Sequence, residues 1–186
     1  MLSWPDPART QWVRQAARRC AAADRRWAIS LYRSGGRPAA LFVLRVVSWL
    51  SDGPLWYATM IGLPLVEGWA GWPCTLQMIT AGAINLLLYL CLKHGIGRHR
   101  PYVACPDIRA CARALDRFSF PSGHALHAVA YAMIISHHYP ALTIPLWAFV
   151  VLVAASRVTL GLHYPSDVLA GGAIGATIAG IVLAWP

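Results

Sequence analysis

The segment 73–92 restricts the fold of this chain more than any other, because it contains no charged side chain. A helix of about 20 apolar residues is long enough to cross the hydrocarbon of a bilayer. Only helices and closed barrels can cross it, since lipid offers the backbone no hydrogen-bond partners. Charged residues make up 12% of the chain, against roughly 25% in soluble domains. The sequence therefore predicts a helical protein whose surroundings are largely lipid.

Four further apolar segments have the composition of membrane crossings, although the first of them is short. They are residues 55–66, 123–136, 141–155 and 168–186. Residues 38–53 are also apolar, but Arg45 and the sequence Asp52-Gly53-Pro54 interrupt them. They can form an interfacial helix or a broken sixth crossing. We therefore predict an all-α fold, a polytopic membrane helical bundle with five to six transmembrane helices.

Residues 1–37 form a separate basic segment with eight arginines and with Trp4, Trp12 and Trp27. No clean apolar core and cleavage site follow the basic part, so the segment is not a secretory signal peptide. Its composition favours an amphipathic helix on an anionic membrane surface, with a solvated basic tail as the alternative. We predict two parts, this N-terminal segment and a transmembrane domain over residues 38–186.

Three polar motifs lie at the ends of the predicted crossings. Motif 1 is Lys93 to Pro101, which reads Lys, six residues, Arg-Pro; motif 2 is Pro121-Ser122-Gly123-His124. Motif 3 is Ser156 to Asp167, which reads Ser-Arg, five residues, His, three residues, Asp. Motif 1 closes the second crossing, motif 2 opens the third, and motif 3 links the fourth and fifth. All three motifs should therefore reach the same face of the membrane.

The cations and donors of these motifs suit a phosphate group. A helix N-terminus offers free N–H groups to an anion, and a guanidinium matches a pair of phosphate oxygens. Together such groups can stabilise the charge on the oxygens of a transferring phosphoryl group. We predict five phosphate-binding residues: Lys93, Arg100, Ser122, Gly123 and Arg157.

The remaining polar residues of the motifs suit covalent catalysis. His163 and Asp167 are four residues apart, so Asp167 can accept a hydrogen bond from one ring nitrogen and leave the other as a nucleophile. His124 can protonate the departing oxygen. We therefore predict His163, Asp167 and His124 as catalytic residues of a two-step reaction through a phosphohistidine.

The acidic residues argue against a metal-dependent reaction. A two-metal phosphatase site needs several convergent carboxylates or histidines, and the seven acidic residues are scattered without such a cluster. We expect no metal and no cofactor. The net charge of +9 is compatible with nucleic acid, but the apolar segments favour anionic lipid or phosphate, so we expect no nucleic-acid partner. Cys105 and Cys111 share one polar loop, and the sequence leaves open whether they form a disulfide.

The three motifs, in this order and spacing, resemble the signature of the type 2 phosphatidic acid phosphatase (PAP2) superfamily. The resemblance covers residues 93–167. It implies a helical bundle and a metal-independent phosphatase for lipid phosphates, with His163 as nucleophile, Asp167 as its partner and His124 as general acid. The small size is similar to that of compact bacterial members that act on undecaprenyl pyrophosphate or phosphatidylglycerophosphate. We therefore expect hydrolysis of a lipid phosphomonoester or pyrophosphate.

The resemblance also implies a multi-pass protein of the cell inner membrane whose active site is on the extracytoplasmic face. With five crossings the arginine-rich N-terminus would share that face, against the positive-inside tendency. A sixth crossing by residues 38–53, or a cytoplasmic active site, would remove the conflict. Two other functions stay open, a lipid phosphotransferase on the same scaffold and a non-catalytic protein that binds anionic lipid. The sequence does not indicate the lipid or the oligomeric state.

Overall fold

The computed structural model describes residues 7–114 and 116–185. Residues 1–6 of the predicted basic segment, with Trp4, lie outside the described residues. The described residues form helices and loops, with one isolated antiparallel bridge between His99 and Phe118. In chain order the elements are α1 (Pro7–Ser34), α2 (Pro38–Leu50), α3 (Pro54–Glu67), the 3-10 helix η1 (Gly68–Gly71), α4 (Trp72–Ile96), α5 (Pro101–Ala104), α6 (Gly123–His138), the 3-10 helix η2 (Pro140–Leu142), α7 (Thr143–Thr159) and α8 (Pro165–Ala184).

Proline and glycine set several of the helix boundaries. Helices α2, α3 and α8 each begin at a proline, whose fixed φ and missing N–H suit the first helical position. Helix α4 ends at Gly97, which has the left-handed φ of 62° and donates its N–H to the carbonyl oxygen of Lys93. The predicted break before residue 55 is confirmed at residues 51–53, between α2 and α3.

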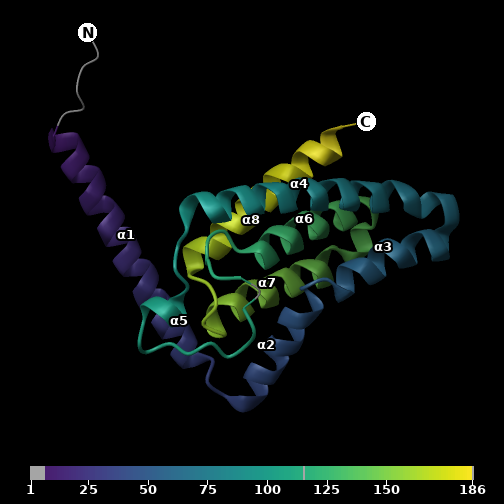
Figure 1. The fold of residues 1–186 in the computed structure, drawn as a ribbon. Helices are drawn as coiled ribbons and strands as arrows, with labels where there is room; N and C mark the ends of the chain where they lie inside the picture. Colours follow the sequence, from purple (N-terminus) through teal and green to yellow (C-terminus); the bar gives the residue numbers. More distant parts are fainter. Residues whose placement is uncertain (1–6, 115, 186) are drawn as a thin grey trace, which may run out of the picture.

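The helices α3, α4, α6, α7 and α8 form an elongated bundle around α6 (Figure 1). Helix α6 contacts α8, α7 and α4, and α3 packs against α4 as the other arm of a hairpin that turns through η1. The loops between α4 and α6, the short helix α5 and the helices α1 and α2 all gather at the opposite end of the bundle from this turn (Figure 1). This end, called the motif end below, holds all three motifs.

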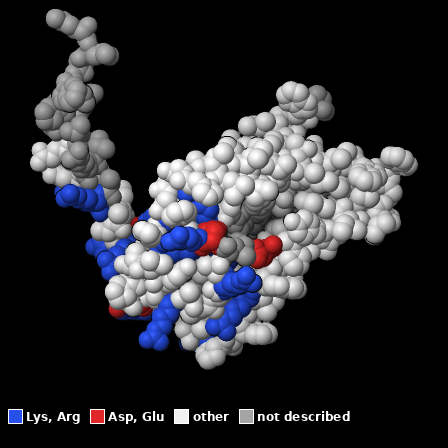
Figure 2. All heavy atoms as spheres, viewed as in Figure 1, with Lys and Arg blue, Asp and Glu red and all other residues white. Residues whose placement is uncertain are grey.

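Charge and apolar surface are separated along the bundle. On the face drawn in Figure 2, the lysine, arginine and acidic side chains gather at the motif end, and the rest of the bundle is almost free of them. Three helical segments of the described residues are long and apolar enough to cross a membrane: Pro54–Ile96, which includes both arms of the hairpin, Pro140–Thr159 and Pro165–Ala184. A helical membrane protein, as predicted, is therefore confirmed.

Small residues bring α6 and α8 close together. A Cβ atom added at Gly171 would collide with the backbone of Ser122, and one at Gly175 would collide with the backbone of Leu126. Because backbone atoms cannot move aside, only glycine fits at these two positions. The close approach holds the N-terminus of α6, and so motif 2, against the first turns of α8.

Candidate active site

The structure brings all eight predicted site residues together at the motif end. Motif 1 closes α4 and leads into α5, motif 2 opens α6, and motif 3 runs from the last turn of α7 to the first turn of α8. A backbone hydrogen bond joins motif 2 to motif 3: the Ser122 N–H donates to the Asp167 carbonyl oxygen at 3.0 Å. The ionisable site residues Lys93, Arg100, Arg157, His163 and Asp167 are removed from water, because all are at most 3% exposed.

The His163 ring is fixed in one tautomer. Its Nδ1 lies 2.6 Å from the Ser119 carbonyl oxygen, and since a carbonyl can only accept, Nδ1 carries the proton. The other nitrogen, Nε2, accepts a contact from Arg100 Nη1 at 3.2 Å. An imidazole held in this way keeps the Nε2 lone pair directed toward the cations of the site.

Asp167 does not form the hydrogen bond to His163 that we predicted. Its Oδ2 lies 3.9 Å from His163 Nδ1, which is too long for a hydrogen bond. Asp167 instead accepts from the Tyr164 N–H at 2.9 Å and from Arg98 Nη1 at 2.7 Å. The reason is local, because an acidic side chain in the first turn of a helix turns back to the free N–H groups there. The Ser119 carbonyl oxygen is the hydrogen-bond partner of His163 Nδ1, where we expected the Asp167 carboxylate.

The environment of His163 keeps the ring uncharged. The pKa of His163 lies well below its ordinary value, first because the ring is buried and then because Arg157 and Arg100 are close. Both effects disfavour the imidazolium. At neutral pH the ring is therefore in the neutral form that a nucleophile requires.

Asp116, to which the sequence assigned no role, lies between two cations of the site. It forms ion pairs with Lys93 and with Arg100, and it accepts a hydrogen bond from the Tyr89 hydroxyl. Burial opposes the charge of Asp116, but its contacts with Lys93, Tyr89 and Arg100 outweigh burial and lower the pKa of Asp116 below its ordinary value. An ionised Asp116 therefore holds motif 1 in place. No spacing or periodicity in the loop between motifs 1 and 2 marked this residue.

Helix α2 also contributes to the site. Arg157 Nη1 donates to the Ser48 hydroxyl, and the Arg157 Nε is buried without a hydrogen-bond partner within residues 7–114 and 116–185. The carboxylate of Asp52, which lies in the turn between α2 and α3, is 3.5 Å from His124 Nε2. The buried Nε is a charged donor that a bound anion can use.

A cavity of about 410 Å³ opens beside His124. Side chains of α3, α4 and α6 line it, and apolar groups dominate, among them Trp56, Ile79 and Leu86. Gly123 and Tyr89 form its wall toward the cations. A phosphate bound among the cations would therefore have an apolar space next to it.

The five cysteines are free in the structure. The Cys105 sulfur lies 3.8 Å from the Tyr164 hydroxyl, and the Cys111 sulfur lies 3.9 Å from the Tyr32 hydroxyl. The sequence left open whether Cys105 and Cys111 form a disulfide, and in the structure they are two separate thiols. No group of three or more His, Cys, Asp or Glu side chains that could bind a metal ion occurs among the described residues.

The family model of the PAP2 superfamily matches residues 72–186. The chain belongs to the PAP2 superfamily. Among curated PAP2 relatives, the decaprenylphosphoryl-5-phosphoribose phosphatase of Mycobacterium tuberculosis is 43% identical over 110 residues, which are 57% of this chain and 59% of the relative. Phosphatidylglycerophosphatase B of Bacillus subtilis is 35% identical over 115 residues, 56% of this chain and 53% of the relative. The chain therefore spans less than two thirds of the length of either protein.

Two solved structures share the fold. Aquifex aeolicus LpxE superimposes with a TM-score of 0.76 at 23% identity, over 84% of this chain and 93% of that chain. A transmembrane PAP2-type phosphatidylglycerolphosphate phosphatase from Bacillus subtilis gives a TM-score of 0.71 at 27% identity, over 88% of this chain and 84% of that chain. Both comparisons extend beyond the region of the family match into the N-terminal helices.

Proposed function

We propose that this PAP2 protein is an integral membrane lipid-phosphate phosphatase that needs no metal. The observation that carries the proposal is the His163 ring, which is buried, neutral and held by Ser119 with its Nε2 toward Arg100. Binding alone would require cations, but it would not require an oriented neutral imidazole among them. The names of the relatives, all phosphatases, agree with this interpretation.

The proposed reaction has two steps. Lys93, Arg100 and Arg157 bind the phosphate oxygens together with the Ser122 hydroxyl and the N–H groups at Gly123. His163 Nε2 attacks the phosphorus as the bond to the leaving oxygen breaks, and His124 gives that oxygen a proton. Water then attacks the phosphohistidine while His124 takes a proton from it, and phosphate leaves with His163 Nε2 regenerated.

The lipid part of the substrate would remain in the bilayer. In this proposal α3, α4, α6, α7 and α8 supply five crossings, and α2 lies at the interface as a continuation of α3. The apolar cavity beside His124 would receive the first part of the lipid chain. The substrate is a lipid phosphomonoester or pyrophosphate, of the undecaprenyl pyrophosphate or phosphatidylglycerophosphate type.

The activity is tested by measuring phosphate release from lipids by the detergent-purified protein. The panel contains undecaprenyl pyrophosphate, phosphatidylglycerophosphate, a polyprenyl-phosphoryl phosphoribose, phosphatidic acid and a soluble phosphate ester. We expect release from at least one lipid, competition by millimolar vanadate and no effect of chelator. Inhibition by chelator that a divalent ion reverses would reject the metal-independent reaction. Transfer of phosphate to a second lipid without release would indicate a phosphotransferase.

The orientation in the cell inner membrane is a further part of the proposal. We propose that the motif end lies outside the cytoplasm, as the resemblance implies. Asp24 of α1 accepts a hydrogen bond from the Ser166 N–H of α8. The arginine-rich helix α1 therefore lies at the motif end as well, and this contact does not fit a crossing by residues 38–53 that would put α1 on the opposite face of the membrane. The positive-inside tendency opposes this orientation, so it needs a direct test.

Single cysteines at the two ends of the bundle provide that test. Ala110 lies in the loop at the motif end, and Trp69 lies at the opposite turn, 89% exposed. We expect that Ala110→Cys, in a protein without its own cysteines, reacts with a membrane-impermeant thiol reagent added outside spheroplasts. Trp69→Cys should react only after lysis. The reverse pattern would place the active site in the cytoplasm.

A further inference from the structure

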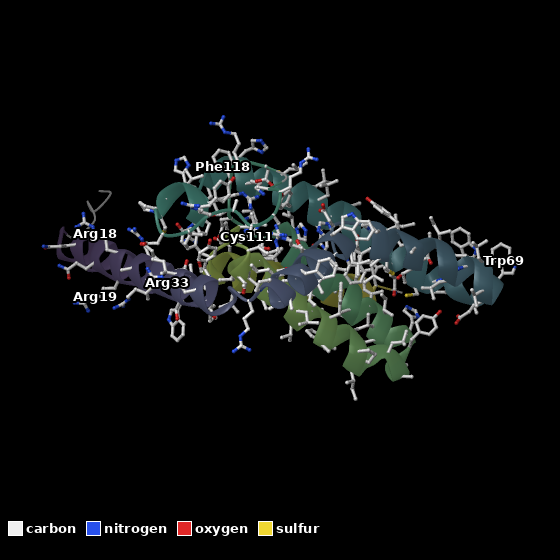
Figure 3. The ribbon with its side chains drawn as sticks, turned by 90° about the horizontal axis from the view of Figure 1, so that it is seen from below. Arg18, Arg19, Arg33, Trp69, Cys111 and Phe118 are labelled. Carbon is white, nitrogen blue, oxygen red and sulfur yellow. The ribbon has the colours of Figure 1, made fainter. Side chains whose placement is uncertain are left out.

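The second half of α1 is packed against the motif end and is not a free tail. Ala28 is only 1% exposed and lies in a small apolar cluster with Cys105, Ile108 and Tyr164. In Figure 3 Arg18 and Arg19 lie toward the end of α1 that extends away from the bundle, whereas Arg33 lies near the bundle. The basic segment of the sequence thus has an outer part and a docked part.

One acidic residue of the docked part, Asp24, bonds directly to motif 1 and motif 3. Asp24 Oδ2 forms an ion pair with Arg98 Nη2 at 2.7 Å and accepts a hydrogen bond from the Ser166 hydroxyl. Its Oδ1 accepts from the Ser166 N–H at 3.0 Å. Both oxygens of the carboxylate are therefore used, and the side chain is only 9% exposed.

Arg98 connects Asp24 to Asp167. Its Nη1 donates to Asp167 Oδ1 at 2.7 Å and to the Ser166 hydroxyl at 2.8 Å, and its guanidinium carbon lies 4.0 Å from the centre of the Tyr164 ring. Burial disfavours the charge on Arg98, but Asp24 and Asp167 outweigh burial and raise the pKa of Arg98. A planar guanidinium with two occupied edges holds both carboxylates in fixed directions.

Asp167 connects Arg98 to the backbone segments that carry the reacting groups. It accepts from the Tyr164 N–H, which directly follows His163, and its carbonyl oxygen accepts from the Ser122 N–H. A displacement of the first turn of α8 would therefore move both the His163 segment and the N-terminus of α6. Misplacement of a reacting group by about 1 Å can cost about 100-fold in rate.

We propose that Asp24 is a positioning residue of the active site, which acts through Arg98 and Asp167 to hold the His163 segment and motif 2 in their reactive geometry. The inference rests on the proposed phosphatase function for its catalytic part. It makes the docked half of α1 a component of the catalytic unit, whereas the sequence predicted a separate segment on the membrane surface.

A second ion pair between α1 and the motif end supplies the matched control. Arg33 and Asp107 approach to 3.5 Å, but their side chains are 68% and 52% exposed. Exposed pairs of this kind contribute little to stability. Asp107 lies in the loop that carries Cys105 and makes no contact with Arg98, so Asp107→Asn removes one α1 contact and leaves the Asp24 network intact.

The experiment compares Asp24→Asn, Asp24→Glu and Asp107→Asn in the full-length protein in detergent. Asp24→Asn should lower kcat by about 10- to 100-fold with little change in KM or in inhibition by vanadate, because Asp24 contacts none of the proposed phosphate ligands. Asp24→Glu should recover part of kcat, and Asp107→Asn should retain full activity. Unchanged kcat in Asp24→Asn would overturn the proposal, as would equal losses in Asp24→Asn and Asp107→Asn.

Hydrogen exchange separates this proposal from the proposed function. In Asp24→Asn the backbone amides of residues 163–168 should exchange at least about 10-fold faster than in the wild type and in Asp107→Asn, since the partly buried ion pair with Arg98 has been removed. This measurement does not depend on turnover. Wild-type protein that releases no phosphate would reject the phosphatase, whereas unchanged exchange over residues 163–168 would reject the positioning role by itself.

Discussion

We expect replacement of His163 by alanine to lower phosphate release from every lipid substrate by a factor on the order of 10⁴ to 10⁶, the cost of removing a covalent nucleophile in other enzymes. The cations that bind phosphate remain, but no group is left to form the covalent intermediate. The substitution should not unfold the protein. It removes the hydrogen bond to the Ser119 carbonyl oxygen and the contact with Arg100 Nη1. A buried partner that is left without its hydrogen bond costs about 1–3 kcal/mol, and Arg100 Nη1 keeps its hydrogen bond to the Leu162 carbonyl oxygen.

The measurement is single-turnover and steady-state phosphate release, with thermal unfolding of each variant in the same detergent. His137→Ala is the control, because His137 is exposed in the last turn of α6. A trapped phosphoprotein that is stable in base and labile in acid should form in the wild type and not in His163→Ala. Retention of most activity in His163→Ala would reject the nucleophile assignment.

Arg100→Lys keeps the charge and should still lower kcat/KM by about 100- to 1,000-fold, the range found when a single oxyanion donor is removed. Arg100 contacts four acceptor atoms with one planar group. Its Nε donates to the Asp116 carbonyl oxygen, its Nη2 pairs with the Asp116 carboxylate, and its Nη1 donates to the Leu162 carbonyl oxygen and to His163. A lysine ammonium is a single point donor and cannot reproduce this fork.

The result is checked by kcat/KM and by the vanadate concentration for half-inhibition, and both should change in the same direction. Arg109→Lys is the control, since Arg109 is exposed in the neighbouring loop. Wild-type kinetics in Arg100→Lys would mean that charge alone is sufficient and that the fork has no role in catalysis.

The helices could be predicted from the sequence because their causes are local. Uncharged apolar segments indicated the spans, and the sequence Asp52-Gly53-Pro54 indicated the break between α2 and α3. Successive crossings run in opposite directions through the membrane, so the order of the crossings was enough to predict that the three motifs lie at the same end. These local signals end at the polar loop between motifs 1 and 2, which has no periodic pattern.

The partners of the site residues could not be predicted, since two of them come from that loop and the third, Arg98, is a residue of motif 1 to which the sequence assigned no role. Ser119 bonds to His163, Asp116 lies between Lys93 and Arg100, and Arg98 pairs with Asp167. Each contact joins residues that are far apart in the chain, so it depends on the packing of the helices. The four-residue spacing leaves the Asp167 carboxylate 3.9 Å from His163 Nδ1, and capping of the N-terminus of α8 decided where the carboxylate points.

The contacts of α1 and α2 with the motif end also affect where the chain can be truncated without loss of the active site. The family match begins at residue 72. Ser48 and Asp24 precede this residue, yet they bind Arg157 and Arg98 within the matched region. A truncated chain that started at residue 72 would contain every motif and would lose both of these partners. We therefore expect the smallest autonomous unit of this chain to be longer than the region of the family match, and a domain exchange with a relative should carry the N-terminal helices together with the motifs.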